Sequence, residues 1–272
     1  MSEPVTPDPW EVLRSATSAR IALGRAGGSL PTKEWLKFKA AHAAARDAVH
    51  HSFDAEGLAA EIAALGVEVL LIDSAAPDRR TFLERPDLGR QLDERSRYAL
   101  QQARGESDVD LAIVVSDGLS AIAAHLQAAP LLKLLLPRLA AEKWSIAPIV
   151  VARFGRVALE DEIGQMLGAR LALMLIGERP GLGSPDSLGA YVVFAPQIGN
   201  TDANRNCVSN IRPEGLPHAA AADTIFYLLS EARQRRLSGV LLKDQRALAN
   251  PGQASAAAGA KAIESTSNVD GN

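Results

Sequence analysis

Four apolar runs in the second half of the chain limit its possible folds more than any other feature. They span residues 109–115, 146–152, 171–176 and 191–195. Their apolar positions are nearly consecutive rather than alternate, so a strand made from each would be covered on both faces. Helical spacing follows each of the first two runs. The pattern predicts an α/β fold, doubly wound around a mainly parallel sheet with helices on both faces.

The helices expected between and after these runs have recognisable ends. Residues 119–144 have helical spacing, and we expect Pro130 and Pro137 to break that helix. Three acids at 160–162 are typical of a helix N-terminus, and Gly168 can close the same helix. A last amphipathic helix is expected to end near Gly239.

The chain divides into four parts by composition. Residues 1–8 and 250–272 are predicted to be disordered, residues 9–105 to form a mainly helical N-terminal region, and residues 106–249 to form the α/β domain. In the N-terminal region, Thr32 is the expected N-cap of one helix, and Pro86 with Asp87 is expected to begin another. A short strand is expected at 67–72, with no readable partner.

Composition excludes several classes of function. The 29 Lys and Arg residues against 32 Asp and Glu residues leave a net charge of −3, without the basic field that binds nucleic acid or an anionic membrane. No apolar stretch reaches the roughly 18 residues that span a bilayer, and the N-terminus does not resemble a secretory signal. The single cysteine excludes an intrachain disulfide and suits a reducing compartment, so we expect a cytoplasmic protein.

Three loops follow the predicted parallel strands and are therefore expected along one edge of the sheet. They are residues 116–120, 153–157 and 177–183. Ligands of doubly wound sheets bind at this carboxyl edge. A polar segment, 200–206, precedes the only cysteine, Cys207.

Familiar chemistries fit these loops poorly. Residues 181–186 begin like a dinucleotide fingerprint, but Asp186 replaces its third glycine, which argues against a nicotinamide-dependent oxidoreductase. No P-loop or spacing of metal ligands is found, and no residue is assigned a catalytic or metal-binding role. Ser116 and Asp117 fit a helix N-cap better than a nucleophile pair. Glu178 could be a ligand-binding carboxylate or form a surface ion pair with Arg179, and Cys207 could bind a ligand or be a small buried hydrophobe.

Several segments, in order along the chain, closely resemble one protein family. They are TSARI at 17–21, GRAG at 24–27, RPDLGR at 85–90, SDGLS at 116–120, GRV at 155–157, GERPGLG at 177–183 and CVSNI at 207–211. Together they resemble the small (light) subunit of ethanolamine ammonia-lyase, from about Trp10 to Leu242. A non-catalytic binding or scaffold protein with a Rossmann-like domain is the alternative.

The resemblance implies a lyase that uses adenosylcobalamin to convert ethanolamine to acetaldehyde and ammonia by radical rearrangement. It implies a large subunit, a (β/α)8 barrel that holds ethanolamine, and heterodimers in a larger assembly. Val157, Glu178 and Cys207 match the family's three positions of cobalamin contact. No histidine follows an Asp by two residues, which fits cobalamin that keeps its own base on cobalt. Some relatives carry a longer N-terminal extension for bacterial microcompartments, so encapsulation of this chain is in doubt.

Overall fold

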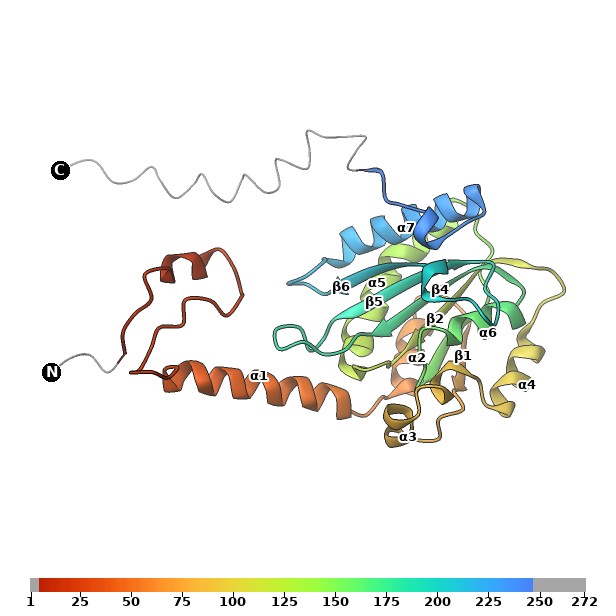
Figure 1. The fold of residues 1–272 in the computed structure, drawn as a ribbon. Coiled ribbons are helices and arrows are strands. Elements are labelled where there is room, and N and C mark those ends of the chain that lie inside the picture. The colour runs from red at the N-terminus through yellow and green to blue at the C-terminus, as the bar shows by residue number, and fades with distance from the viewer. Residues whose placement is uncertain (1–4, 247–272) are drawn as a thin grey trace.

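One six-stranded sheet forms the body of the protein in a computed structural model that describes residues 5–246 (Figure 1). The strand order is β1-β3-β2-β4-β5-β6. The strands are β1 (Val69–Asp73), β2 (Val109–Ser116), β3 (Ile149–Arg153), β4 (Ala169–Gly177), β5 (Leu188–Phe194) and β6 (Arg205–Ile211). The tail expected to be disordered, at 250–272, lies outside the described residues.

The direction of the strands corrects one part of the prediction. β1, β3, β2 and β4 are parallel, whereas β5 and β6 are antiparallel to their neighbours. Residues 178–187, which join β4 to β5, contain no crossover helix, so β5 returns beside β4 in the opposite direction. The α/β class is confirmed, and the sheet is mixed rather than parallel throughout.

The two outer strands were the hardest to place from sequence. The strand expected at 67–72 is β1, and it joins the sheet through β3, with Val69 beside Ile149. Strand β6 was not predicted, because buried and exposed residues are mixed along it instead of forming an apolar run: Arg205 and Val208 are buried while Cys207 and Ser209 are exposed. Half-covered strands of this kind are typical of antiparallel sheet edges.

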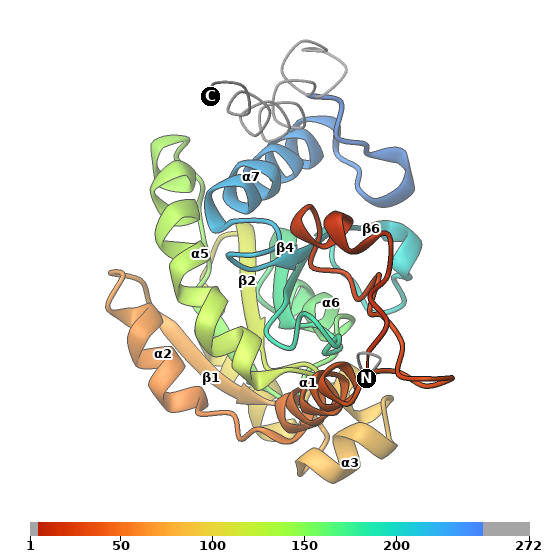
Figure 2. The ribbon, with the colours of Figure 1, turned by 90° about the vertical axis from the view of Figure 1, so that its left-hand side faces the viewer.

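Helices cover both faces of the sheet, and the two faces have separate cores. α2 (Ala55–Ala63), α5 (Ala121–Ala141) and α7 (His218–Arg235) pack on one face, which Figure 2 shows to one side of the strands. α4 (Glu94–Ala103) and α6 (Leu159–Met166) pack on the other face. The short α3 (Arg79–Glu84) lies beside β1 and the end of α1 (Thr32–His50). Both faces of β2, β3 and β4 are therefore covered, as the apolar runs predicted.

Helix α5 is continuous through Pro130 and Pro137, contrary to the expected break. Each proline removes the hydrogen bond to the carbonyl four residues earlier, at Leu126 and Lys133. Both of those residues are exposed, so water can satisfy the two carbonyls. The other side of the helix stays buried against the sheet and keeps the helix intact.

Several predicted helix ends differ from the observed ones. Ser120, rather than Ser116 or Asp117, caps α5, and its side chain accepts a hydrogen bond from the backbone of Ala123 at 3.2 Å. No single helix begins at Pro86: a short 3₁₀ turn there is followed by α4, capped by Asp93. The N-cap of α1 is Pro31 rather than the predicted Thr32, which is the first residue of the helix, and no side chain caps it. Gly168 follows α6 with a left-handed φ of 67°, as predicted.

Helix α1 and the segment before it project from the body (Figure 1). Of the 19 residues of α1 only Ala48 is buried. The preceding segment reaches the body where Arg20 donates a hydrogen bond to the carbonyl of Leu182 in the β4–β5 loop, at 3.0 Å. Among the described residues, no helix is long and apolar enough to cross a membrane.

Candidate functional site at the carboxyl edge of the sheet

The three predicted loops meet at one edge of the sheet because β2, β3 and β4 are parallel and end there. The backbone N–H of Leu119 donates to the carbonyl of Gly177 at 2.9 Å, which ties the first loop to the third. A Cβ on Gly118, whose φ is +50°, would lie 2.4 Å from that carbonyl, and one on Gly177 would lie 2.1 Å from the carbonyl of Ser120. Only glycine allows this approach at either position.

The close approach leaves a hollow of about 360 Å³ above the ends of these strands. It is lined by Gly118, Leu119, Arg156, Val157, Ile176, Gly177, Glu178, Arg179 and Tyr191. Val157 and Glu178, predicted from separate segments, therefore line one cavity. A second hollow of about 440 Å³ shares Arg156 and Val157 with the first and extends toward Arg90 and Asp202.

Glu178 reaches from the end of β4 across the next two strands. Its carboxylate accepts hydrogen bonds from the hydroxyls of Ser187 and Ser209, both at 2.5 Å, and from the backbone N–H of Asn210 at 3.2 Å. Among residues 5–246 no cationic side chain forms an ion pair with it, so the ion pair with Arg179 does not form. The carboxylate fixes β5 and β6 to the end of β4, and Oε1 retains capacity to accept another donor.

Cys207 lies on β6 directly opposite Tyr191 of β5. Its side chain is exposed, which contradicts the alternative of a buried hydrophobe. Desolvation of the sulfur raises the pKa of the Cys207 thiol, the Glu178 carboxylate adds to the rise, and the Tyr191 phenol opposes it. The thiol is thus protonated at neutral pH and unsuited to act as a nucleophile. Tyr191, which sequence reasoning missed, joins Cys207 to the hollow that Glu178 lines.

The buried side chain of Asp117 links the first two loops. Its carboxylate accepts hydrogen bonds from the backbone N–H of Phe154 and from Arg79, both at 2.8 Å, and lies 3.2 Å from the hydroxyl of Ser116. Burial raises the pKa of Asp117 to about 6, although the Arg79 guanidinium opposes the rise. Arg79 also donates to the carbonyl of Val49, which anchors the end of α1 to the same place.

A buried group of charges supports strand β6. Arg205 donates to Glu160 at 2.9 Å and also pairs with Asp161, whose carboxylate accepts a hydrogen bond from Asn200. Burial raises the pKa of Glu160 well above its usual range, although Arg205 opposes the rise. The sequence suggested that the acids of α6 only complement the helix N-terminus. In the fold Glu160 and Asp161 also tether α6 to β6, through Arg205, which lies two residues before Cys207.

Two other sites considered from the sequence are absent here. No helix follows Gly181 to Gly183, which lie in the β4–β5 loop, so the dinucleotide-binding arrangement does not form. Across residues 5–246, no group of three or more His, Cys, Asp or Glu side chains is placed to hold a metal ion.

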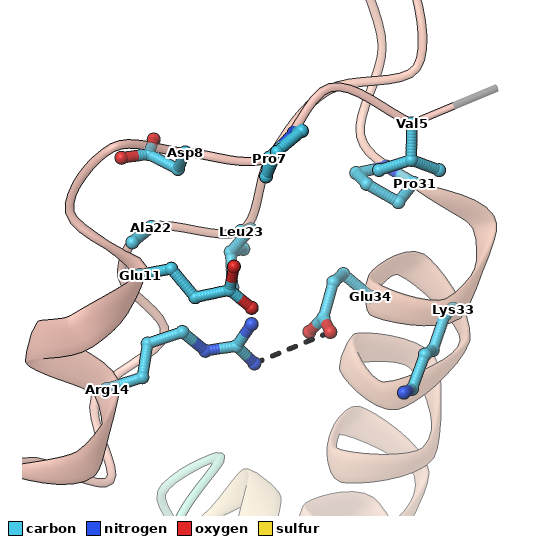
Figure 3. Close-up of a pocket in the computed structure, with 11 residues that line it drawn as sticks. Val5, Pro7, Asp8, Glu11, Arg14, Ala22, Leu23, Pro31, Lys33 and Glu34 are labelled. Carbon is cyan, nitrogen blue, oxygen red and sulfur yellow. Dashed lines mark hydrogen bonds and ion pairs between the residues drawn. The ribbon is translucent and has the colours of Figure 1, made fainter. Parts of the chain in front are cut away.

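A separate hollow lies in the N-terminal region between the first segment and α1 (Figure 3). Figure 3 shows Arg14 and Glu34 facing each other across it, and their charges pair at 3.4 Å. None of the three predicted residues lines it. The edge of the sheet, where loops from three strands converge around Glu178, is therefore the better candidate for a ligand.

Comparison with known proteins agrees with the arrangement at this edge. Residues 7–243 match the family model described as ethanolamine ammonia-lyase light chain (EutC). The chain belongs to this family. The chain is 57% identical over 242 residues to the ethanolamine ammonia-lyase small subunit of Ralstonia nicotianae, covering 88% of this chain and 90% of the relative. The small subunit of Azotobacter vinelandii is 56% identical over 248 residues, covering 90% and 92%. That of Pseudomonas putida KT2440 is 56% identical over 243 residues, covering 88% and 89%.

The match covers the body of the protein and nearly all of the described N-terminal region. It includes all three loops at the carboxyl edge and strand β6 with Cys207. The resemblance drawn from the sequence motifs is thereby confirmed. The family's members carry the words small subunit or light chain in their names, which places them in a complex with a larger chain.

Proposed function

We propose that this chain is the small subunit of an adenosylcobalamin-dependent ethanolamine ammonia-lyase, which produces acetaldehyde and ammonia. The large subunit would hold ethanolamine, and this chain would complete the seat of the cofactor with Val157, Glu178 and Cys207. Adenosylcobalamin supplies the radical when its cobalt–carbon bond breaks. The observation that carries the proposal, in a chain of this family, is that Val157 and Glu178 line one hollow and that Cys207 pairs with Tyr191, which lines the same hollow.

The chemistry of this edge fits a corrin ring, whose rim carries neutral amide side chains. Such amides donate hydrogen bonds, and Glu178 offers an acceptor with remaining capacity. Val157 supplies apolar surface beside it. The exposed side chains of Cys207 and Ser209 extend this surface along β6. The chain's own work would be to bind and orient the cofactor, since no side chain here is assigned to proton transfer.

The N-terminal region supports a large partner chain that covers part of this protein. Large apolar side chains there are exposed, including Trp10 at 66%, Val12 at 74% and Leu36 at 59%. Apolar surface of this size on one region is typical of protein–protein contacts. We assign it to the large subunit, because the same region touches the β4–β5 loop beside Glu178. A reducing cytoplasm suits the single exposed thiol.

Co-expression with the large subunit tests the proposed activity. The complex should release ammonia from ethanolamine when adenosylcobalamin is added, and its absorbance should report cleavage of the cobalt–carbon bond. Either purified subunit alone should release none. Ammonia release by this chain alone would contradict the division of roles, as would a complex that turns over ethanolamine without the cofactor.

Substitution Glu178→Ala tests the cofactor seat directly. Loss of a partner for a bound amide should weaken cobalamin affinity of the complex by about 1–3 kcal/mol, measured by equilibrium dialysis. Glu214→Ala is the matched control, because Glu214 is an exposed carboxylate in the loop after β6 and does not line the hollow. Equal affinities for the Glu178→Ala variant and the native complex would remove Glu178 from the site.

A further inference from the structure

The second hollow at the carboxyl edge is surrounded by arginines that have too few acids to balance them. Arg156 lines both hollows, Arg90 lines the second and Arg179 lines the first. Among residues 5–246, none of these three forms an ion pair within 4 Å. Arg79 lies nearby as well, but its charge is paired with Asp117 at 2.8 Å. The net effect is a local excess of positive charge on a protein with a net charge of −3.

Several contacts fix the position of Arg156. Its guanidinium lies 4.1 Å from the centre of the Phe82 ring and donates to the Phe82 carbonyl at 3.0 Å. Its backbone N–H donates to the carbonyl of Gly89 at 2.7 Å, where a Cβ would lie 2.8 Å from the Arg156 side chain. Its Nε is buried with no hydrogen-bond partner in the described structure. The protein therefore holds this cation in place without neutralising it.

Burial and the nearby arginines disfavour the positive charge of Arg156. Burial lowers the pKa of Arg156, and the positive charges of Arg79, Arg90 and Arg179 add to the fall, against one opposing carboxylate, Asp117. A bound anion would relieve this repulsion. The other carboxylates of the two hollows do not pair with these three arginines: Glu178 accepts hydrogen bonds from the Ser187 and Ser209 hydroxyls, and the exposed Asp202 pairs with Arg205 at 3.7 Å.

We propose that Arg156 and Arg90, with Arg179 beside them, form a phosphoryl-anion subsite that binds the phosphodiester of the cobalamin nucleotide tail. The inference rests on the proposed function, because it places a second part of the same cofactor. Cobalamin carries neutral amides around the corrin and one anionic phosphodiester in its tail. The edge offers both kinds of group: Glu178 lines the first hollow, Arg90 lines the second, and Arg156 lines both. Arginine suits this role because its planar group donates to two phosphate oxygens at once.

The test compares two corrinoids in the complex with the large subunit: cobalamin, and cobinamide, which lacks the phosphodiester and nucleotide. Affinity is measured by equilibrium dialysis, with the corrin absorbance as readout, so no turnover is needed. Arg156→Gln should weaken cobalamin binding about 10- to 100-fold and leave cobinamide binding unchanged. Equal weakening of both corrinoids, or no weakening of cobalamin, would overturn the subsite.

Two further variants separate this role from a purely structural one. Arg90→Gln should weaken cobalamin selectively as well, and because Arg90 is exposed and forms no ion pair the variant should unfold at the same temperature as the native protein. Arg85→Gln is the matched control: it removes an arginine from the same segment that is already paired with Asp87 at 2.7 Å, and both affinities should stay unchanged. Loss of selectivity in the control equal to that of Arg90→Gln would contradict the proposal.

Equilibrium dialysis with the two corrinoids also tests which anion occupies the subsite, and it separates failure of this subsite from failure of the proposed function. Inorganic phosphate should compete with cobalamin but not with cobinamide in the native complex. Phosphate that binds without displacing cobalamin would show a site for a free anion and overturn the tail as its occupant. Native complex that binds neither corrinoid would overturn the proposed function, whereas equal affinity for both would overturn only this subsite.

Discussion

The body of the protein and its N-terminal region bury their helices very differently. Helix α5 in the body buries 11 of its 21 residues, whereas α1 in the N-terminal region buries one of 19. In α1, Trp35 and Phe38 stack on each other at 6.0 Å while remaining partly exposed. The body is therefore stabilised by its own core, whereas the N-terminal region leaves large apolar side chains exposed.

Charged pairs show the same contrast. In the body, the side chains of Arg205 and Glu160 are 2% and 0% exposed, while in the N-terminal region those of Arg14 and Glu34 are 32% and 10% exposed. Removing one partner of a buried pair leaves an uncompensated charge, whereas water replaces a lost surface partner. Three predictions use this difference between the two regions, and they follow in order of expected effect on stability.

The largest effect is expected from Arg205→Gln. The substitution leaves Glu160 and Asp161 buried without their cation and should lower the free energy of unfolding by about 3–5 kcal/mol. Urea denaturation, followed by circular dichroism, measures this loss. Arg14→Gln is the paired control in the N-terminal region and should leave the denaturation midpoint unchanged. Similar midpoints for the two variants would show that the two regions do not differ in this way.

A pH effect of about 3 kcal/mol is expected from Asp117. Its folded pKa of about 6 exceeds the ordinary value of 3.8, so the folded state binds the proton more tightly. This stabilisation is complete below about pH 4 and is lost as pH rises through 6. The slope of unfolding free energy between pH 4 and 7 should be less negative in Asp117→Asn than in the native protein.

Glu34 in the N-terminal region should act with the opposite sign. Hydrogen bonding from Lys37 lowers the pKa of Glu34, so its contribution is present above the unfolded pKa and is lost as pH falls. Glu34→Gln therefore serves as the comparison in the same titration. A slope in Asp117→Asn identical to that of the native protein would show that Asp117 does not take up a proton in this range.

The smallest effect on stability is expected from substitutions on the exposed side of α1. Trp35→Ser with Leu36→Ser should change the unfolding free energy by less than about 0.5 kcal/mol, because neither side chain is buried in this chain. The same pair should weaken association with the large subunit, measured by analytical ultracentrifugation. Arg46→Ser, an exposed charge in the same helix, is the control. Unchanged association in the double variant would leave the apolar surface without its assigned partner.

Part of the fold could be read from the sequence because it depends on local pattern. The apolar runs identified β2, β3 and β4, and their shared direction brought three loops to one edge. Strand β5 was found but its direction was not, because an apolar run is the same in a parallel and in an antiparallel central strand. The continuity of α5 through two prolines was not predicted, because it depends on which side of the helix faces water.

The residues of the candidate site could be named from the sequence, but their arrangement in space could not. Val157, Glu178 and Cys207 were named from motifs, but their grouping needed the sheet, since Cys207 reaches the hollow only through its pairing with Tyr191. The charges around Arg156 were not predicted either. In sequence, Arg90 and Arg156 stand 66 positions apart, and no local pattern indicates that they share a hollow.

The sequence by itself determined the α/β class, the family and the loops that carry the site, because apolar periodicity and short motifs are properties of neighbouring residues. Only the tertiary structure decided which charges are paired. Arg205 is neutralised inside the body, Glu178 is held by two hydroxyls, and Arg156 keeps a positive charge beside other arginines. Electrostatic energy depends on distance and burial. Both are set by strand pairing and packing, which bring together residues far apart in the chain.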